Sequence, residues 1–137
     1  MAKALRTAKC GKQEARVRLA TARAYLEVAS TVRAEQSRDE FLNVAAGLEV
    51  LAGIAASDAI CCARLRSRHR GDDHRSAADL LKTAVPDGAK LSASFARLLD
   101  VKDEAHYGVI GVSPRKARNA VGWAASLVAR AADEVER

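Results

Sequence analysis

The sequence has few aromatic residues, prolines or cysteines, and each shortage narrows the choice of fold. Aromatic residues make up 4% of the 137 residues, and there are two prolines. Ala, Leu and Val dominate instead, a composition that favours closely packed helices over a sheet. A chain of this length buries about two-thirds of its unfolded surface in one domain without metals or disulfides. We therefore expect a single all-α domain.

The sequence has an odd number of cysteines, namely Cys10, Cys61 and Cys62. They form neither a C-x-x-C motif nor an even-numbered set, which is typical of a reducing compartment. Cys62 lies on an apolar helix face, where a cysteine is usually a small buried hydrophobic residue. The N-terminus "MAKALRTAKCGKQ" lacks the apolar segment of a signal peptide. These features predict a cytoplasmic protein without disulfides.

Long apolar runs and cofactor motifs are also missing. The most apolar stretch, residues 41–65, is interrupted by Glu49 and Asp58. This leaves residues 50–57 as a run free of charge, far below the roughly 20 residues of a membrane span. Adjacent cysteines on a helix point about 100° apart, unlike the ligands of a zinc knuckle. There is no Gly-rich phosphate loop. We therefore expect no membrane partner, no metal and no cofactor.

Positive charges outnumber negative charges in the sequence, and they are unevenly distributed along it. The net charge is +6. Residues 1–38 carry nine Lys/Arg against three Asp/Glu, and residues 64–75 carry five against two, whereas residues 39–63 hold four acids and no base. Basic regions of this kind attract phosphate groups. The alternative is that the arginines only solubilise a helical protein.

Hydrophobic periodicity predicts five helices, at residues 12–34, 38–66, 73–83, 89–107 and 114 to the C-terminus. Three of the helix starts have capping signals, namely Ser37 with Glu40, Asp72 with Asp73, and Ser113 with Pro114. Gly88, in a Pro-Asp-Gly turn, is expected to supply a positive φ. The short connections predict an up-and-down four-helix bundle with an additional short helix. Residues 1–11 are expected to be a flexible basic tail, and residues 12–137 the domain.

Asp58 is the exception on an apolar seam of the second helix that includes Val44, Leu48 and Leu51. A buried carboxylate is costly unless it is paired or hydrogen-bonded. Lys102 and His106 follow Leu98 at four-residue spacing on the inner face of the fourth helix. An Asp58–Lys102 or Asp58–His106 contact is the expected pairing, and the alternative is that Asp58 reaches water at the edge of the seam.

The stretch "LLDVKDEAHYG" at residues 98–108, with Lys102, His106 and Tyr107, resembles the R-x-x-x-[D/H]-Y motif of the HEPN superfamily (higher eukaryotes and prokaryotes nucleotide-binding domain). "ASDAICC" in the second helix and "RGDDHRSAADLL" after it are similar to an actinobacterial subgroup. The resemblance covers residues 17–135. It implies a helical bundle, often a homodimer, with roles in RNA cleavage, toxin–antitoxin pairs, nucleotide binding or protein scaffolding.

Family members that cleave RNA do so without metal, and the resemblance implies an arginine and a nearby histidine as their catalytic residues. Histidine would transfer protons and arginine would stabilise phosphorane charge. Lys102 stands in the arginine position and lacks the bidentate fork of a guanidinium. Lys102 and His106 are the candidate catalytic pair, and Arg68 with His74 is the alternative. Tyr107 either belongs to the motif or is a surface aromatic at the end of the bundle.

The stretch "RLRSRHRGDDHRSA" at residues 64–77 joins the second and third helices. Contacts to phosphate depend on charge density more than on exact spacing, so four of its residues are candidate phosphate ligands: Arg66, Arg68, Arg70 and Arg75. The alternative is a solvated, capped hinge.

Our leading hypothesis is a non-catalytic, dimeric HEPN-like module that binds RNA, a nucleotide or a protein encoded nearby. The alternatives are a metal-independent endoribonuclease of the toxin type and a pure protein-interaction scaffold.

Overall fold

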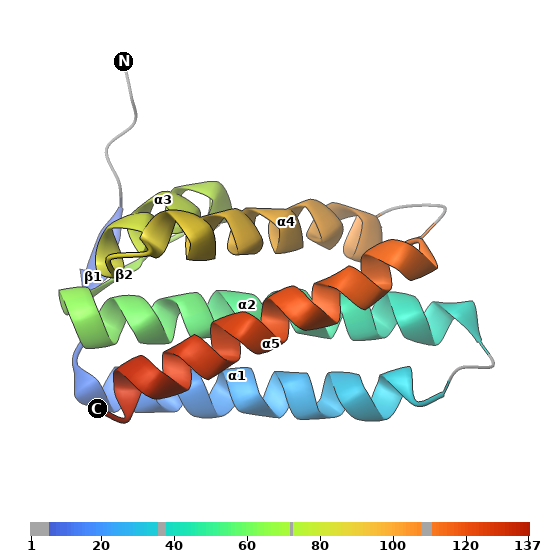
Figure 1. Ribbon diagram of the computed structural model, residues 1–137, viewed down its shortest axis with the longest axis horizontal. Coiled ribbons are helices and arrows are strands. Elements are labelled where there is room, and N and C mark those ends of the chain that lie inside the picture. The colour runs from blue at the N-terminus through green and yellow to red at the C-terminus, as the bar shows by residue number, and fades with distance from the viewer. Residues whose placement is uncertain (1–5, 36–37, 72, 108–110) are drawn as a thin grey trace, which may run out of the picture.

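The computed structural model describes residues 6–35, 38–71, 73–107 and 111–137, apart from the side chains of residues 106 and 107. Within these ranges the elements are β1 (Thr7–Lys9), α1 (Lys12–Arg33), α2 (Asp39–Leu65), β2 (Ser67–His69), α3 (His74–Ala84), α4 (Gly88–Tyr107) and α5 (Pro114–Val135) (Figure 1). Each helix end lies within two residues of its predicted position. The all-helical class is confirmed, and the two-stranded sheet was not predicted.

Two predicted helix caps are present in the structure. The Ser113 side chain accepts a hydrogen bond from the backbone N–H of Lys116 at 3.3 Å, directly before Pro114 in the first turn of α5. The Asp73 side chain caps α3 by accepting from the backbone N–H groups of Arg75 and Ser76. Its predicted companion Asp72 lies outside the described residues. Polar side chains therefore define these two starts locally.

Two other helix starts differ from the sequence expectation. α2 is capped by Arg38 in an extended backbone conformation, and the Arg38 guanidinium donates to Glu40 at 2.7 Å. The predicted cap, Ser37, lies outside the described residues. Gly88 has no positive φ. It is the first residue of α4, and a Cβ there would collide with the carbonyl oxygen of Lys82, so close backbone approach explains this glycine.

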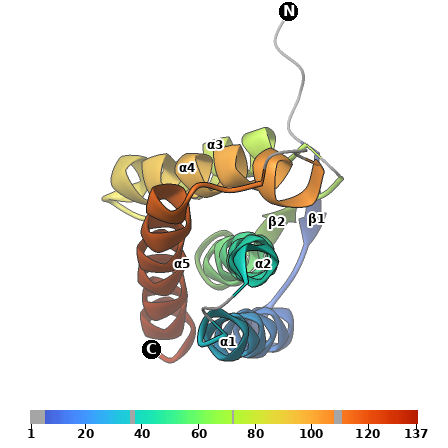
Figure 2. The ribbon, with the colours of Figure 1, turned by 90° about the vertical axis from the view of Figure 1, so that its right-hand side faces the viewer.

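α2 lies at the centre of the molecule, with α1, α5 and the layer of α3 and α4 on three sides (Figure 2). Small residues allow this close approach. A Cβ on Gly53 would lie 2.6 Å from a methyl carbon of Leu98 in α4 and 3.5 Å from one of Leu127 in α5. Six alanines of the same helix are fully enclosed: Ala45, Ala46, Ala52, Ala55, Ala56 and Ala59. Several neighbours therefore enclose this helix.

By length and composition alone, α2 could cross a membrane, and it is the one such helix among the described residues. However, 72% of its most apolar window is buried inside the protein. This burial is compatible with the core helix of a soluble protein.

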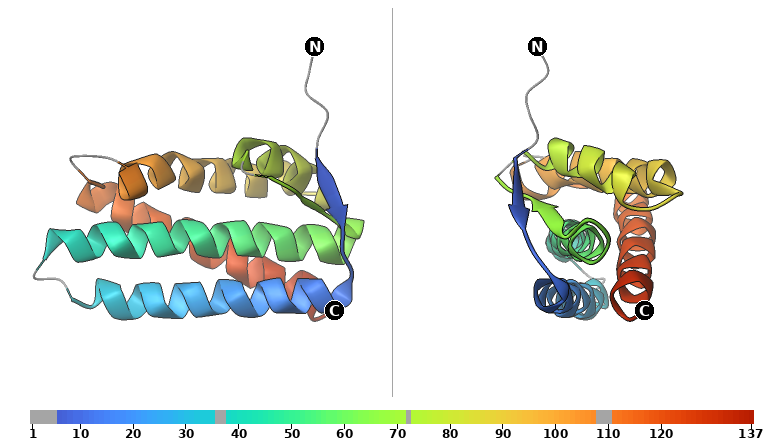
Figure 3. Two further views of the ribbon diagram at one scale, coloured as in Figure 1. Left: turned by 180° about the vertical axis from the view of Figure 1, so that it is seen from behind. Right: turned by 90° about the vertical axis from the view of Figure 1, so that its left-hand side faces the viewer.

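One side of α2 remains partly open. Val44, Leu48 and Leu51 lie about half a turn around the helix from Gly53, at 100° per residue. Val44 is 50% exposed, and Leu48 and Leu51 are half-buried. Seen from behind, this side of α2 lies between α1 and α4, and β1 and β2 cross it only at the C-terminal end of the helix (Figure 3). Part of the predicted apolar seam is therefore surface.

Candidate nucleic-acid interface and its pocket

The two basic regions of the sequence meet in an antiparallel β ribbon, formed by β1 and β2. The register pairs Ala8 with Arg68. Two backbone hydrogen bonds extend the pairing at its ends, from Cys10 N–H to the Arg66 carbonyl at 3.1 Å and from Arg70 N–H to the Arg6 carbonyl at 2.9 Å. Hydrogen bonding of the backbone thus joins the N-terminal basic region to the segment after α2. We call the end of the molecule that carries this pairing the ribbon end.

The ribbon corrects two predictions. Residues 7–9 form a strand where a flexible basic tail was expected. Cys10 and Cys62 form a disulfide, although the odd number of cysteines argued against one. Cys61 is free and buried, and burial raises the pKa of its thiol to about 12. The cysteine count misled because the partners lie 52 residues apart and meet only through a strand pairing that hydrophobic periodicity does not signal.

Arginine side chains at the ribbon end differ in how far they are neutralised. Arg66 and Arg70 are exposed, and neither forms an ion pair with any described residue. Arg75 is held differently, because it donates to the Asp100 carboxylate on α4 and to the Ala96 carbonyl. Of the predicted phosphate contacts, Arg66, Arg68 and Arg70 are brought together on the ribbon, while the charge of Arg75 is compensated by Asp100.

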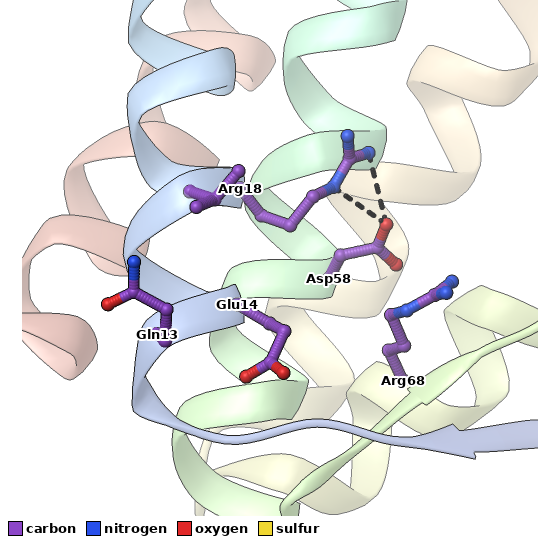
Figure 4. Close-up of a pocket in the computed structure, with 6 residues that line it drawn as sticks. Gln13, Glu14, Arg18, Asp58 and Arg68 are labelled. Carbon is purple, nitrogen blue, oxygen red and sulfur yellow. Dashed lines mark hydrogen bonds and ion pairs between the residues drawn. The ribbon is translucent and has the colours of Figure 1, made fainter.

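A pocket of about 470 Å³ opens where α1, α2 and the ribbon meet (Figure 4). Its wall is formed by six residues: Gln13, Glu14, Val17, Arg18, Asp58 and Arg68. Two of them, Asp58 and Arg68, are candidates from the sequence. The Glu14 carboxylate accepts the backbone N–H of Gly11 at 2.8 Å, and this hydrogen bond lowers its pKa. The wall therefore combines two cations and two anions.

Asp58 is paired with Arg18 of α1. The Nε and Nη2 atoms of Arg18 lie 3.1 and 3.0 Å from the same carboxylate oxygen, Oδ2. The Asp58 side chain is 15% exposed. Burial raises its pKa, and the positive charges of Arg18 and Arg68 oppose that rise. The carboxylate is thus partly desolvated and held between two guanidinium groups.

The predicted pairing of Asp58 with Lys102 or His106 is wrong, because the register of α4 on α2 separates them. Asn43 of α2 donates to the carbonyl of Ala105 at 2.7 Å, which places the end of α4 beside the start of α2. Asp58 lies about four turns, or ~22 Å, further along α2. Sequence periodicity identifies the inner face of each helix but not how far one helix slides along its neighbour.

The motif that carries the family resemblance lies at the opposite end of the molecule from the ribbon (Figure 1). Lys102 is half-buried on α4. The side chains of His106 and Tyr107 lie outside the described part of the chain. The roles assigned to these three residues therefore stay predictions.

The alternative catalytic pair, Arg68 and His74, comes from neighbouring segments of the ribbon end. Arg68 lines the pocket, and His74 is the first residue of α3. The His74 ring lies 6.5 Å from that of His69, which is 8% exposed. The catalytic role of the Arg68–His74 pair also stays a prediction.

Sequence reasoning missed Arg18, the partner of Asp58. Arg18 directly precedes the buried Leu19 and lies one turn before Ala22, so it borders the apolar stripe of α1. An arginine at the edge of a stripe could have been matched with an acid on the seam of α2. Without the register of the two helices, however, eight other basic residues in the region 1–38 were equally available.

Sequence reasoning also missed a second buried ion pair. Glu49 is fully enclosed and binds the Arg33 guanidinium, which also donates to the Ala117 carbonyl at 3.1 Å. Arg33 therefore links α1, α2 and α5. Burial raises the pKa of Glu49, and Arg33 opposes that rise.

No family model matches this chain, and a search of curated proteins found no match either.

Proposed function

We propose that the protein is a HEPN-like up-and-down helical bundle that binds single-stranded RNA through the ribbon end and does not cleave it. One observation carries the proposal. The ribbon places Arg66 and Arg70 side by side with the N-terminal basic segment, and leaves both arginines exposed without an ion pair among the described residues. Exposed, uncompensated guanidinium groups bind phosphate oxygens.

Salt-dependent binding tests this proposal. Fluorescence anisotropy with a labelled U-rich 12-mer should show binding that weakens linearly on a log–log plot against salt concentration. The double variant Arg66→Glu/Arg70→Glu should bind more weakly, and the slope should decrease by about 1.4 because each lost phosphate contact removes about 0.7.

A matched control is available at the other end of the molecule. Arg115 and Arg118 are exposed in the first turns of α5, far from the ribbon (Figure 1). Arg115→Glu/Arg118→Glu changes the net charge by the same amount and should leave most of the affinity. Equal losses in the two double variants would show that only net charge matters, and no binding at low salt would remove the proposal.

The same RNA separates binding from catalysis. Incubated with the protein in EDTA, it should remain intact. Cleavage that disappears in His106→Ala or His74→Ala would instead favour the metal-independent endoribonuclease.

A second proposal concerns the open side of α2, which favours a homodimer. Val44, Leu48 and Leu51 form an apolar strip on this side of α2, because Glu49, the charged residue between Glu40 and Asp58, is fully buried on another side of the helix. A two-fold axis crossing this strip brings identical strips together. It also sets the acidic start of α2, at Asp39 and Glu40, toward the basic ribbon end of the second copy. This charge complementarity favours a second copy over an unrelated partner.

Light scattering after size-exclusion chromatography tests the dimer. The wild-type protein should have about twice the mass of the chain, and Leu51→Glu should be a monomer that keeps its helical circular dichroism. The substitution Val28→Glu, at another exposed apolar position on α1, serves as control. A monomeric wild-type protein would exclude this interface.

A further inference from the structure

The ribbon-end pocket is not built for phosphate. Its charged wall residues are Glu14, Arg18, Asp58 and Arg68, so its formal charges cancel. A carboxylate inside a phosphate site would repel the ligand. The pocket therefore suits a neutral group that offers hydrogen-bond donors to a carboxylate and acceptors to a guanidinium.

Asp58 keeps hydrogen-bonding capacity for such a group. Both contacts from Arg18 end on Oδ2, and among the described residues none donates to Oδ1. An ionised carboxylate has about four acceptor positions. The free oxygen is directed toward the guanidinium of Arg68 across the pocket (Figure 4). Asp58 and Arg68 do not form an ion pair with each other within 4 Å, whereas Asp58 and Arg18 do, and both Asp58 and Arg68 line the pocket.

Arg68, on the ribbon, also keeps hydrogen-bonding capacity for a ligand in the pocket. Its only described hydrogen bond is a long one, from Nη1 to the backbone carbonyl of His69 at 3.3 Å. The remaining N–H groups of its fork can donate to two adjacent acceptors. Val17, which is 53% exposed, supplies apolar surface beside the two polar groups. The volume of about 470 Å³ accommodates a single planar base.

Resting on the RNA-binding function proposed above, we infer that this pocket binds a guanine base next to phosphates held by Arg66 and Arg70. Guanine presents two adjacent donors, N1–H and the 2-amino group, for the Asp58 carboxylate. It also presents two adjacent acceptors, O6 and N7, for the fork of Arg68, the commonest specific contact of arginine with a base. Adenine, cytosine and uracil lack this combination. Bases of single-stranded RNA can enter such a pocket because they are not paired.

Single-base substitutions in the RNA test the inference. A U-rich 12-mer with one central guanine should bind the wild-type protein about tenfold more tightly than the all-uracil 12-mer, since one bidentate contact discriminates by at least this factor. The same 12-mer with inosine, which lacks the 2-amino group, should fall between them. Competition with free GMP distinguishes a base within RNA from a free nucleotide, because millimolar GMP should displace the RNA only weakly.

Variants connect the preference to the pocket. Asp58→Asn should abolish the guanine preference while retaining affinity for the all-uracil RNA. Asp133→Asn is the matched control, because it makes the same charge change at an exposed carboxylate of α5 that does not line the pocket. Arg68→Gln should also abolish the guanine preference. It is the second test variant if thermal melting shows that Asp58→Asn does not fold.

The outcomes separate this inference from the proposed function. Equal affinity for both RNAs, or a preference that survives Asp58→Asn and Arg68→Gln, would overturn the guanine site and leave RNA binding in place. The absence of any binding at low salt would overturn both. Displacement of the RNA by micromolar GMP would overturn the inference in its present form, because the ligand of the pocket would then be a free guanine nucleotide and not a base within RNA.

Discussion

α2 carries two buried carboxylates, each paired with an arginine of α1, and the two pairs differ in what surrounds them. Glu49 is fully enclosed, and its partner Arg33 also binds a backbone carbonyl of α5. Asp58 is 15% exposed and borders the ribbon-end pocket. The same chemical pair therefore links three helices in one place and faces an open pocket in the other. The two pairs differ in the burial around them and not in the chemistry of the ion pair.

Removing the arginines should produce the largest difference between the pairs. Arg33→Ala leaves the fully enclosed Glu49 without its partner and should lower the free energy of unfolding by about 4 kcal/mol. Arg18→Ala should cost only about 1 kcal/mol, because water in the pocket can solvate Asp58. Urea denaturation followed by circular dichroism measures both. Similar losses would show that Asp58 is as structural as Glu49.

Opening the disulfide should disturb the ribbon end selectively. Cys10→Ser removes the link to Cys62 and should lower the free energy of unfolding by about 3 kcal/mol, since a cross-link across a long loop restricts the unfolded chain. The control is Cys61→Ala, which changes a buried thiol outside the disulfide and should cost less. RNA affinity should decrease in Cys10→Ser alone. An unchanged affinity would mean that the ribbon persists without the covalent link.

The pH dependence of stability should have the same sign for both carboxyls. Burial raises the pKa of Glu49 and of Asp58 in the folded protein. The neutral forms therefore contribute stability that is present at low pH and is lost as pH rises through the folded-state pKa values. From pH 4.5 to pH 7, the wild-type protein should lose stability relative to Glu49→Gln and to Asp58→Asn. Urea titrations at several pH values measure this, and a wild-type gain relative to both variants would contradict it.

The smallest effect concerns the backbone at Arg66, which closes α2 in the left-handed region with φ of 56°. Glycine is favoured in this conformation. Arg66→Gly should therefore raise the free energy of unfolding by about 0.5 kcal/mol while weakening RNA binding. Lower stability with unchanged binding would show that Arg66 serves the fold instead. No comparable strain occurs near Glu49 in the described chain.

Helices were predictable because their signals are local. Apolar residues at three- and four-residue spacing, the Asp73 cap and the Ser113–Pro114 start located the helices to within two residues. The three-residue strands could not be found in this way, because they are too short for alternation to emerge. Their pairing depends on contacts between residues about 60 positions apart.

The candidate site was only partly predictable for the same reason. Asp58 and the ribbon arginines could be identified from their composition and position, since an acid on an apolar seam and a dense basic stretch are visible in the sequence. Arg18 and Cys10 could not be identified as partners, because the sliding register of α1 and the path of the N-terminal strand have no local signal. The predicted partner, Lys102, lies on a half-buried face of α4. However, this part of α4 lies beside the start of α2, about four turns away from Asp58.

The sequence by itself determined the helical class, the helix limits, the excess of positive charge and the need of Asp58 for a partner. These follow from propensity, periodicity and the cost of burying a charge, which act within a few residues of each other. Only the tertiary structure decided that Arg18 satisfies Asp58 and that the disulfide and ribbon join two basic regions. It also decided that Glu49 is sealed while Asp58 faces a pocket. Those outcomes depend on how whole helices slide and pack, and each register is set by the sum of many distant contacts.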